Sequence, residues 1–519
     1  MKMKKLMALL LAVCTITGSL AGCGQEETSV PQDTSEKKEN ITEGSTDSAS
    51  SSETETTPEE VNLYEEEVNL IWVQPTIESI EVNLNAIMEE INKITKEKIN
   101  TTITLLPIPF AEYEQRLRMM YTAGEAWDVT HGGFCNPLAT GVSMGAFAPI
   151  PLETLNTYAP EYMTHFDESV WEAVTFNGEI YATPIEQQWS NQFCAFFNED
   201  LIEKYGFDYT KVKTLDDLDE FMAIVKENEP DIVPIKLEAN SLSLMCNYFG
   251  WDPLVAHNVP GIVYDTAETP TAVNQFETDE FKSLLETTRR WYQAGYIPED
   301  AATGGTSSSE KDFAVHLAVY VPGRRETYKN LYGFYLKEQP IGEISALKTS
   351  KIQEHTQVIS SNCENIERAV AFINLLNTDQ ELLNLYLYGI LGTDWEFADT
   401  ETNVVKSISG HYAYDFFVGN TLNTYPNDPS AIGFGEEVLE LNAKSKASPI
   451  LGFTFNAEPV SAQIAQCIAI TDEYLPGFVT GTVDASAEYD DFINNLKKAG
   501  MDDILAEMQK QIDEWLANR

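Results

Sequence analysis

Residues 68–73 are Val-Asn-Leu-Ile-Trp-Val, a short apolar run that predicts a buried strand stopped by Pro75. The next residues predict further elements in alternation: a helix over 84–94, a strand over 102–106 ended by Pro107 and Pro109, a helix over 112–121 and a strand over 128–130. Strands that alternate with helices are typical of a parallel sheet covered by helices on both faces.

Ligands of such sheets bind at the carboxyl ends of the strands. We therefore expect a binding site at the loops 74–76 and 131–136, which follow the first and third predicted strands. Gln74 and Phe134 are candidate ligand-binding residues because of this position alone.

Apolar residues at helical spacing also predict helices in the remainder of the chain. One stripe covers residues 281–292 and ends at Gly295. Two more helices, over 489–496 and 504–516, are separated by Gly500. Cys467 lies in another apolar stretch and is expected to be a packed thiol.

The N-terminus has the pattern of a secretory signal. Lys2, Lys4 and Lys5 precede an apolar run that is too short to span a membrane, and the run leads to Leu20-Ala-Gly-Cys23. This ending resembles the bacterial lipobox, which implies that residues 1–22 are a signal peptide and that Cys23 is acylated. Residues 23–64 would then be a disordered, acidic, Ser/Thr-rich tether on the outer face of the bacterial cytoplasmic membrane.

The composition excludes several classes of function. The 33 Lys and Arg residues face 82 Asp and Glu residues, a formal charge of −49 that would repel nucleic acid. The six histidines form no metal-binding motif, and no phosphate loop or nucleophile elbow is present. We therefore expect no metal, no cofactor and no enzymatic activity, although a carboxylate pair suited to glycoside hydrolysis is neither supported nor excluded.

Several stretches resemble the extracellular solute-binding proteins of ABC importers, of the carbohydrate-type family 1. They are Gly145–Ile150, Phe176–Pro184, Phe197–Gly206, Trp291–Ile297 and Asn365–Asn374. Three C-terminal stretches resemble a lipoprotein subgroup of that family: Gly452–Val460, Tyr474–Asp484 and Leu496–Asp502. The segment Gly389–Trp395 departs from the subgroup, which usually has Gly-Ile-Glu-Gly-x-His-Tyr there. Whether this segment contacts ligand is left open.

The resemblance implies an α/β, two-lobed, periplasmic-binding-protein-like (type II) fold with a hinge. The expected boundaries are 65–186 for the first segment of lobe 1, 187–311 for the first segment of lobe 2, 312–390 for the second segment of lobe 1, and 391–519 for a C-terminal region packed mainly with lobe 2.

The resemblance further implies capture of a small solute, a sugar or oligosaccharide, by hinge closure and its delivery to the transmembrane subunits of an ABC permease. We expect a monomer. The alternatives are a peptide-binding or sensory lipoprotein of the same fold, or a surface enzyme that degrades glycans. The sequence identifies neither the solute nor the permease, and one disulfide among the widely spaced cysteines remains open.

Side chains suited to sugars supply the other candidate ligand-binding residues. Gln187, Gln188 and Trp189 combine two amides with an indole, although the indole could instead pack at the hinge. The remaining candidates each have an alternative structural role: Trp251 and Trp395 as packed indoles, Arg324 as a surface ion-pair partner, and Tyr412 and Tyr414 as alternate residues of a buried strand.

Overall fold

The computed structural model describes residues 64–237, 239–303 and 312–519. The predicted signal peptide, Cys23 with its predicted acylation, and nearly all of the predicted tether lie outside these residues. No helix in the described ranges is both long enough and apolar enough to cross a membrane. Two hydrophobic cores, each built around its own sheet, divide the described chain into a first and a second lobe.

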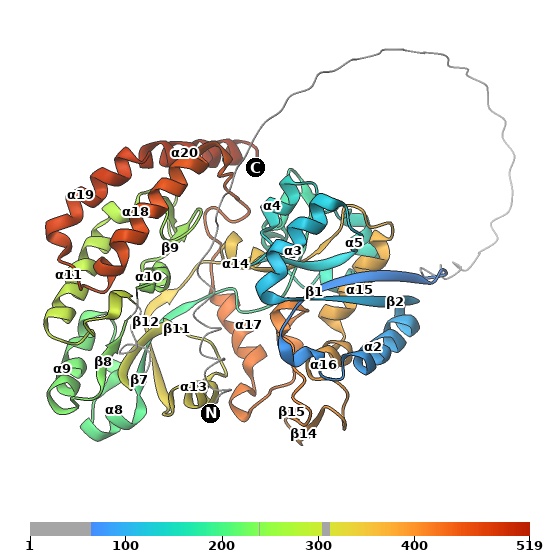
Figure 1. The fold of residues 1–519 in the computed structure, drawn as a ribbon, viewed down its shortest axis with the longest axis horizontal. Coiled ribbons are helices and arrows are strands. Elements are labelled where there is room, and N and C mark those ends of the chain that lie inside the picture. Colours follow the sequence, from blue (N-terminus) through green and yellow to red (C-terminus); the bar gives the residue numbers. More distant parts are fainter. Residues whose placement is uncertain (1–63, 238, 304–311) are drawn as a thin grey trace, which may run out of the picture. The chain divides into compact units, whose positions relative to one another are not determined.

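The first lobe is built on a five-stranded sheet (Figure 1). Its strands, in spatial order, are β2 (Thr101–Pro109), β1 (Val68–Thr76), β3 (Val129–Gly133), β13 (His355–Ile359) and β6 (Thr183–Pro184). β1 pairs in parallel with β2 and β3, which confirms the predicted parallel arrangement, while β13 runs antiparallel to β3 and β6.

The predicted strand ends at Pro75 and Pro107 are wrong, because β1 and β2 continue through both prolines. β2 lies at the edge of the sheet, and beyond Val73 the strand β1 pairs only with β2. A proline is tolerated where its missing N–H faces no partner strand. The extension carries both strands further toward the edge where the candidate site lies.

Helices pack around this sheet, with α2 and α16 in mutual contact. The helices of the first lobe are α2 (Leu84–Ile99), α3 (Phe110–Ala123), α4 (Leu138–Ser143), α5 (Leu152–Tyr158), α6 (Pro160–Met163), α7 (Glu168–Glu172), α14 (Thr349–Gln353), α15 (Ile366–Thr378) and α16 (Gln380–Tyr388). Two small hairpins complete it: β4 (Thr175–Phe176) with β5 (Glu179–Ile180), and β14 (Trp395–Asp399) with β15 (Val404–Ser407).

The second lobe is built on a four-stranded mixed sheet. Its strands, in spatial order, are β12 (Leu336–Ile344), β7 (Gln192–Asn198), β11 (Phe313–Val319) and β8 (Val233–Lys236). β9 (Trp251–Pro253) and β10 (Ile262–Tyr264) form a separate hairpin in the same lobe.

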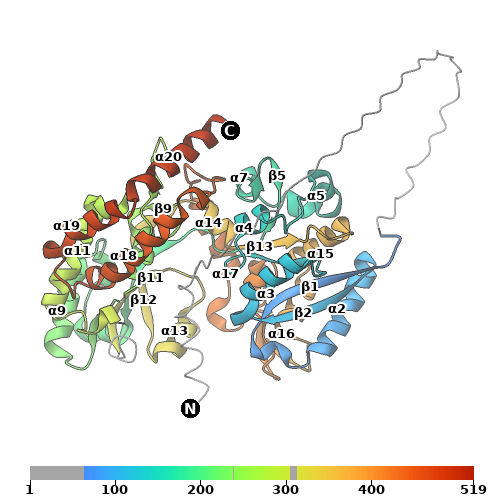
Figure 2. The same ribbon diagram turned by 45° about the horizontal axis from the view of Figure 1, so that its top comes forward.

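The C-terminal helix α18 packs against α11 and against the other two C-terminal helices, α19 and α20 (Figure 2). The helices of the second lobe are α8 (Glu199–Tyr205), α9 (Asp219–Asn228), α10 (Ser241–Phe249), α11 (Asp279–Gln293), α13 (Arg325–Tyr332), α18 (Ser461–Val479), α19 (Ala485–Lys498) and α20 (Met501–Ala517). The predicted helix stop at Gly500 is confirmed: its φ of 97° lies in the left-handed region that favours glycine. Cys467 is buried in α18, and it is a free thiol, as are Cys194, Cys246 and Cys363.

The predicted return to the first lobe at residue 312 is wrong. Residues 313–344 supply β11 and β12 to the second sheet, and the chain enters β13 of the first sheet only at His355. Likewise, residues 395–418 pack into the first core rather than with lobe 2. The Gly- and Ser-rich stretch before Phe313 has the composition of a linker, although the strand that follows it belongs to the same lobe as the preceding helices.

Three chain segments pass between the two cores and are joined to one another by hydrogen bonds. They are residues 185–191, 345–348 and 419–459, and the last contains α17 (Phe434–Lys444). The Asn442 side chain of α17 braces the first segment: its Oδ1 accepts from the backbone N–H groups of Trp189 and Ser190, and its Nδ2 donates to the Gln187 carbonyl oxygen. The first two segments are joined through Ser345, whose Oγ accepts from the Asn191 N–H at 2.9 Å.

Replacing Asn442 with alanine should lower the free energy of unfolding by about 1–3 kcal/mol, because buried backbone groups of the first segment lose their partners. Hydrogen exchange at the amides of Trp189 and Ser190 should accelerate. Asn442→Asp, which keeps the acceptor and loses the donor, serves as the matched control and should have a smaller effect at these two amides. Unchanged exchange in Asn442→Ala would show that the side chain does not brace this segment.

Candidate functional site

The candidate site lies at the edge of the first sheet where β1, β2 and β3 end. Six aromatic residues meet there and form what we call the aromatic wall: Phe110, Phe134, Tyr412, Tyr414, Phe416 and Phe417. Phe110 follows β2, and its ring lies parallel to that of Phe134, with 6.3 Å between the centroids. The centroids of the Phe417 and Phe110 rings are 5.6 Å apart. Phe134 is 41% exposed, so the wall presents an aromatic face to solvent.

Buried amides hold the chain segment that carries Phe416 and Phe417. Gln74 is 1% exposed, and its Nε2 donates to the Phe417 carbonyl oxygen at 3.2 Å. Gln357 Nε2 donates to the Val418 carbonyl oxygen at 2.7 Å. Gln74 therefore lies at the predicted place but positions the aromatic wall, and in this structure its side chain is not exposed to a ligand.

A pair of buried histidines lies beneath the aromatic wall. His131 Nε2 and His355 Nδ1 are 3.0 Å apart, on the neighbouring strands β3 and β13. Burial lowers the pKa of His355 to about 4 and lowers that of His131 well below its usual range. Both rings are therefore neutral near pH 7, which keeps charge out of the layer on which Phe417 packs. Within the described residues, no group of three or more His, Cys, Asp or Glu side chains is arranged to hold a metal ion.

A third histidine, His411, fixes the start of the segment that carries the tyrosines. Its Nδ1 lies 2.8 Å from the Val82 carbonyl oxygen and its Nε2 lies 3.0 Å from the Tyr386 carbonyl oxygen. Both ring nitrogens thus face acceptors, one on the chain after β1 and one on α16. Residues 411–414 form no strand, and the buried strand considered for Tyr412 is not present.

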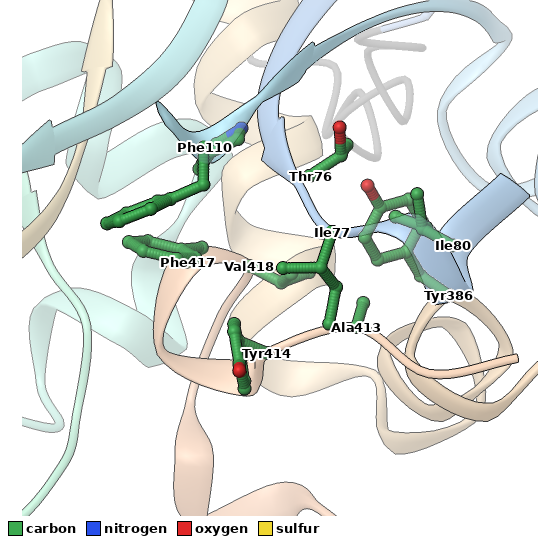
Figure 3. Close-up of a pocket in the computed structure, with 10 residues that line it drawn as sticks. Thr76, Ile77, Ile80, Phe110, Tyr386, Ala413, Tyr414, Phe417 and Val418 are labelled. Carbon is green, nitrogen blue, oxygen red and sulfur yellow. The ribbon is translucent and has the colours of Figure 1, made fainter. Parts of the chain in front are cut away.

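The aromatic wall borders a small pocket with a cavity volume of about 10 Å³ (Figure 3). Figure 3 shows the rings of Phe110 and Phe417 on one side of it and Tyr386 on the other. The pocket is lined by Pro75, Thr76, Ile77, Ile80, Phe110, Tyr386, Ala413, Tyr414, Phe417 and Val418.

Charged groups lie beside the tyrosines of the wall. Burial raises the pKa of Asp415, and the nearby guanidinium of Arg324, from the second lobe, partly offsets this rise. Arg324 is exposed and immediately precedes α13. The surface ion pair considered as the alternative role of Arg324 is formed by its neighbour Arg325, whose Nη2 lies 2.6 Å from Glu199 Oε2. Arg324, Tyr412 and Phe134 are thus three predicted residues that lie at or near one site.

Gln187, Gln188 and Trp189 lie on the first segment between the cores. The Trp189 indole is buried against Phe166, at 5.3 Å between ring centroids. Gln188 Nε2 donates to the carbonyl oxygens of Ser190 and Tyr320. These contacts favour the hinge-packing alternative for this cluster over direct contact with ligand.

The other two tryptophans are also packed. Trp251 is 0% exposed in the second core, next to Phe249, so the expected stacking platform is not available in this structure. Trp395 is buried against Phe397 and Tyr425, and its Nε1 donates to the Gly389 carbonyl oxygen. The divergent segment Gly389–Trp395 thus closes on itself through this indole.

The sequence analysis missed half of the aromatic wall. Phe110, Phe416 and Phe417 were not among the candidates, nor were His131 and His355. Phe110 follows a strand in the same way as Gln74 and Phe134 and could have been found by the same rule. The dense run Tyr412–Phe417 is a second signal, but its position beside β1 depends on contacts that span more than 300 residues.

Comparisons with known proteins agree with this architecture. The model of the family described as bacterial extracellular solute-binding protein matches residues 89–393, and a domain of unknown function (DUF3502) matches residues 449–517. A carbohydrate ABC transporter substrate-binding protein from Streptococcus pneumoniae is 28% identical over 445 residues, which are 84% of this chain and 89% of that protein.

Solved structures extend this similarity to the fold. The N-glycan transport solute-binding protein NgtS from Streptococcus pneumoniae matches with a TM-score of 0.76 and 26% identity, covering 87% of this chain and 100% of that one. Its complex with Man1GlcNAc matches with a TM-score of 0.66 at the same identity and the same coverage of both chains. These neighbours share the predicted two-lobed type II fold. Because the family model covers more than half of its length, this chain belongs to the family of bacterial extracellular solute-binding proteins.

Proposed function

We propose that this protein captures an oligosaccharide at the aromatic wall and delivers it to an ABC permease. The observation that carries the proposal is the aromatic face at the carboxyl edge of the first sheet, with an exposed arginine of the second lobe nearby. Sugar rings present C–H faces that pack on aromatic rings and hydroxyl groups that bind charged and amide side chains. Phe134 and Tyr414 supply the first kind of contact, and Arg324 and Asp415 supply the second.

Closure of the lobes would couple binding to transport. A solute held between Arg324 and the aromatic wall makes contacts with both lobes only when they approach each other, so it stabilises the closed state by those extra contacts. The braced segments at Asn442 and Ser345 are where such a motion would be absorbed. No bond of the solute needs to break.

The relatives support the class of solute. One similar protein is a carbohydrate transporter component, and NgtS was solved with Man1GlcNAc and with Man5GlcNAc. We extend an oligosaccharide ligand to this chain on that basis. Acylation at Cys23, attachment to the outer face of the cytoplasmic membrane and a monomeric state complete the proposal, and they rest on the lipobox-like sequence and the family.

A thermal-shift screen of the purified chain tests the solute class. The panel contains mannosyl-N-acetylglucosamine, a mannopentaose, uronic and sulfated sugars, and short peptides. A ligand at a hundred times its dissociation constant stabilises the folded state by about 2.7 kcal/mol, which is a shift of a few degrees for a domain of this size. A sugar hit that remains chemically intact supports the proposal. A peptide hit without a sugar hit contradicts the solute class, and conversion of the sugar would indicate an enzyme.

Replacing Phe134 with alanine should weaken sugar binding about tenfold, because the exposed ring of the wall is lost as a packing surface. Stability should change by about 1 kcal/mol or less, since the side chain is largely exposed. Phe134→Leu keeps apolar area without a planar face, so its sugar affinity should lie between those of the wild type and Phe134→Ala. Isothermal titration provides the affinities, with Leu152→Ala, an exposed apolar residue on α5, as the control that should bind normally. Wild-type affinity in Phe134→Ala would remove this ring from the site.

A further inference from the structure

A second pocket, which we call the distal pocket, opens on the first lobe at the end of the sheet opposite to the aromatic wall. It has a cavity volume of about 130 Å³ and is lined by Trp127, which precedes β3, and by Ser360, which follows β13. Since β13 runs antiparallel to β3 and pairs Ile359 with Val129, the distal pocket lies at the start of β3, whereas Phe134 follows its end. β3 has five residues and spans about 13 Å, which separates the two sites.

The distal pocket has a buried, mainly apolar floor and a rim that is open to solvent. Met120, Trp127 and Ala146 are buried at the floor. The partly exposed ring of Tyr121 lies above them, with 5.4 Å between its centroid and that of the Trp127 indole, and Met144 on the rim is 47% exposed. An engineered cavity of about 150 Å³ in another protein binds benzene, so a pocket of about 130 Å³ that is open to solvent receives one six-membered ring.

The polar part of the rim is a turn that directly follows β13, and its backbone is held in place. The Ser360 N–H donates to the Asp128 carbonyl oxygen at 2.9 Å, and the Asn362 N–H donates to Ser360 Oγ at 3.2 Å. The Ser361 N–H donates to the Ala146 carbonyl oxygen at 2.9 Å. The side chains of Ser361 and Asn362 are exposed and hydrogen-bond to no other described residue. A ligand that uses these free groups therefore pays little for ordering the turn.

The lining of the distal pocket narrows the chemical class of its ligand. None of the residues that line it carries a charge, so a charged ligand would lose hydration without meeting an opposite charge. An entirely apolar ligand would cover the amide of Asn362 and the hydroxyl of Ser361 and leave them unpaired. A neutral sugar ring meets both conditions, because its C–H face packs on an aromatic ring and its hydroxyl groups pair with the rim.

We propose that the distal pocket is a second binding site, which takes one neutral sugar unit of a glycan. The sugar ring lies on Tyr121 and beside Met144, and its hydroxyl groups exchange hydrogen bonds with the Ser361 hydroxyl and the Asn362 amide. The hydroxyl groups that point away from the floor face solvent, where a longer glycan continues. Because the distal pocket lies apart from the aromatic wall, the two sites bind independently, and this inference does not depend on the proposed function.

The test is an NMR titration of the full chain with carbon-13 in its methionine methyl groups. The ligands are the methyl glycosides of glucose, galactose and mannose. The Met144 signal should shift with a dissociation constant of about 1–10 mM, as expected for contact with a single ring. Met119 is 51% exposed but does not line the distal pocket, so its signal is the internal control and should shift much less. Phenol, which has a ring but one hydroxyl group, and glucuronate, which adds a charge, should both bind more weakly.

Three variants connect the signal with the rim and separate it from the aromatic wall. Asn362→Ala removes the rim amide and should weaken binding about fivefold, because a hydrogen bond to a sugar hydroxyl is lost. Asn494→Ala changes another exposed asparagine, on α19 of the second lobe, and is the matched control that should bind normally. Phe134→Ala alters the aromatic wall and should leave the shift of Met144 unchanged.

The other outcomes contradict the second site. The proposal is wrong if no methyl glycoside shifts the Met144 signal at about 50 mM, well above the expected dissociation constant. It is also wrong if Met119 shifts as much as Met144, or if Asn362→Ala binds as tightly as the wild type. Tighter binding of phenol than of the glycosides would indicate an apolar side chain of a partner protein as the occupant. Loss of the shift in Phe134→Ala would assign the signal to the aromatic wall.

Discussion

Replacing Trp251 with alanine should lower the free energy of unfolding by about 3–5 kcal/mol, because it opens a large cavity in the second core. The indole is 0% exposed and packs against the ring of Phe249. Trp251 itself lies on β9, in the hairpin that β9 forms with β10. The backbone at this position is also held, since Lys348 Nζ donates to the Trp251 carbonyl oxygen at 2.6 Å. Equilibrium denaturation in urea measures the change.

Trp251→Ala and Phe134→Ala form a contrasting pair. The first should reduce stability and leave the sugar affinity of the folded protein within about twofold, whereas the second should reduce affinity and largely spare stability. Trp251→Phe, which keeps most of the apolar volume, is the control for the cavity and should lose much less. If Trp251→Ala were stable and unable to bind sugar, the indole would belong to the ligand site after all.

Acid should destabilise the first lobe through its buried histidine pair. His355 has a pKa of about 4 in the folded protein against about 6.5 in an unfolded chain, and the pKa of His131 is lowered as well. Between about pH 4 and about pH 6.5 the unfolded chain binds more protons at this histidine than the folded protein does, so the free energy of unfolding rises with pH. Lowering the pH from 7 to 4 should remove about 3 kcal/mol of stability through His355 alone.

One buried carboxyl group acts in the opposite direction. Burial raises the pKa of Asp252 to about 6, so its contribution to stability is present at low pH and is lost as the pH rises through 6. Asp252 therefore offsets part of the acid loss in the total stability curve. The contribution of the histidine is isolated by comparing the wild type with His355→Gln, which cannot titrate in this range.

The free energy of unfolding of the wild type, minus that of His355→Gln, should decrease by about 3 kcal/mol from pH 7 to pH 4. In NMR spectra of the folded wild type, the ring of His355 should remain neutral down to about pH 5, and the ring of His131, whose pKa burial also lowers, should not titrate in its usual range. A constant difference across this range, or a His355 ring that titrates near pH 6.5, would show that the pair is not held neutral by burial.

The predicted strands and helices of the first lobe follow from local patterns. Apolar runs at residues 68–73 and 102–106, with helical spacing between them, place β1, α2 and β2 in the order that the structure shows. Gly500 ends a helix for a local reason, its positive φ. The strand ends predicted at Pro75 and Pro107 were wrong because a proline ends a strand only if a partner strand lies on the side of its missing N–H. The position of the partner strands is a property of the whole sheet.

The lobe boundary and most of the site follow from distant contacts. β11 joins the second sheet because it pairs with β7 and β8, and no local feature of residues 313–319 distinguishes that sheet from the first. Likewise, Trp251 and Trp395 have the residue type expected of sugar-binding sites, and only their burial shows that they pack. The residue type determines which groups a side chain is able to bind, and its exposure in the folded protein determines whether a ligand reaches it.

The sequence by itself determined the family resemblance, the alternating strands and helices, and the edge of the sheet at which to search, because these depend on neighbours within a few turns of chain. The tertiary structure alone decided which side chains line that edge. Phe417 reaches the end of β1 through a hydrogen bond to Gln74, 343 residues away in sequence, and Tyr386 reaches the pocket from α16. Such contacts are fixed by the packing of the whole first core, and packing is a property that no single segment encodes.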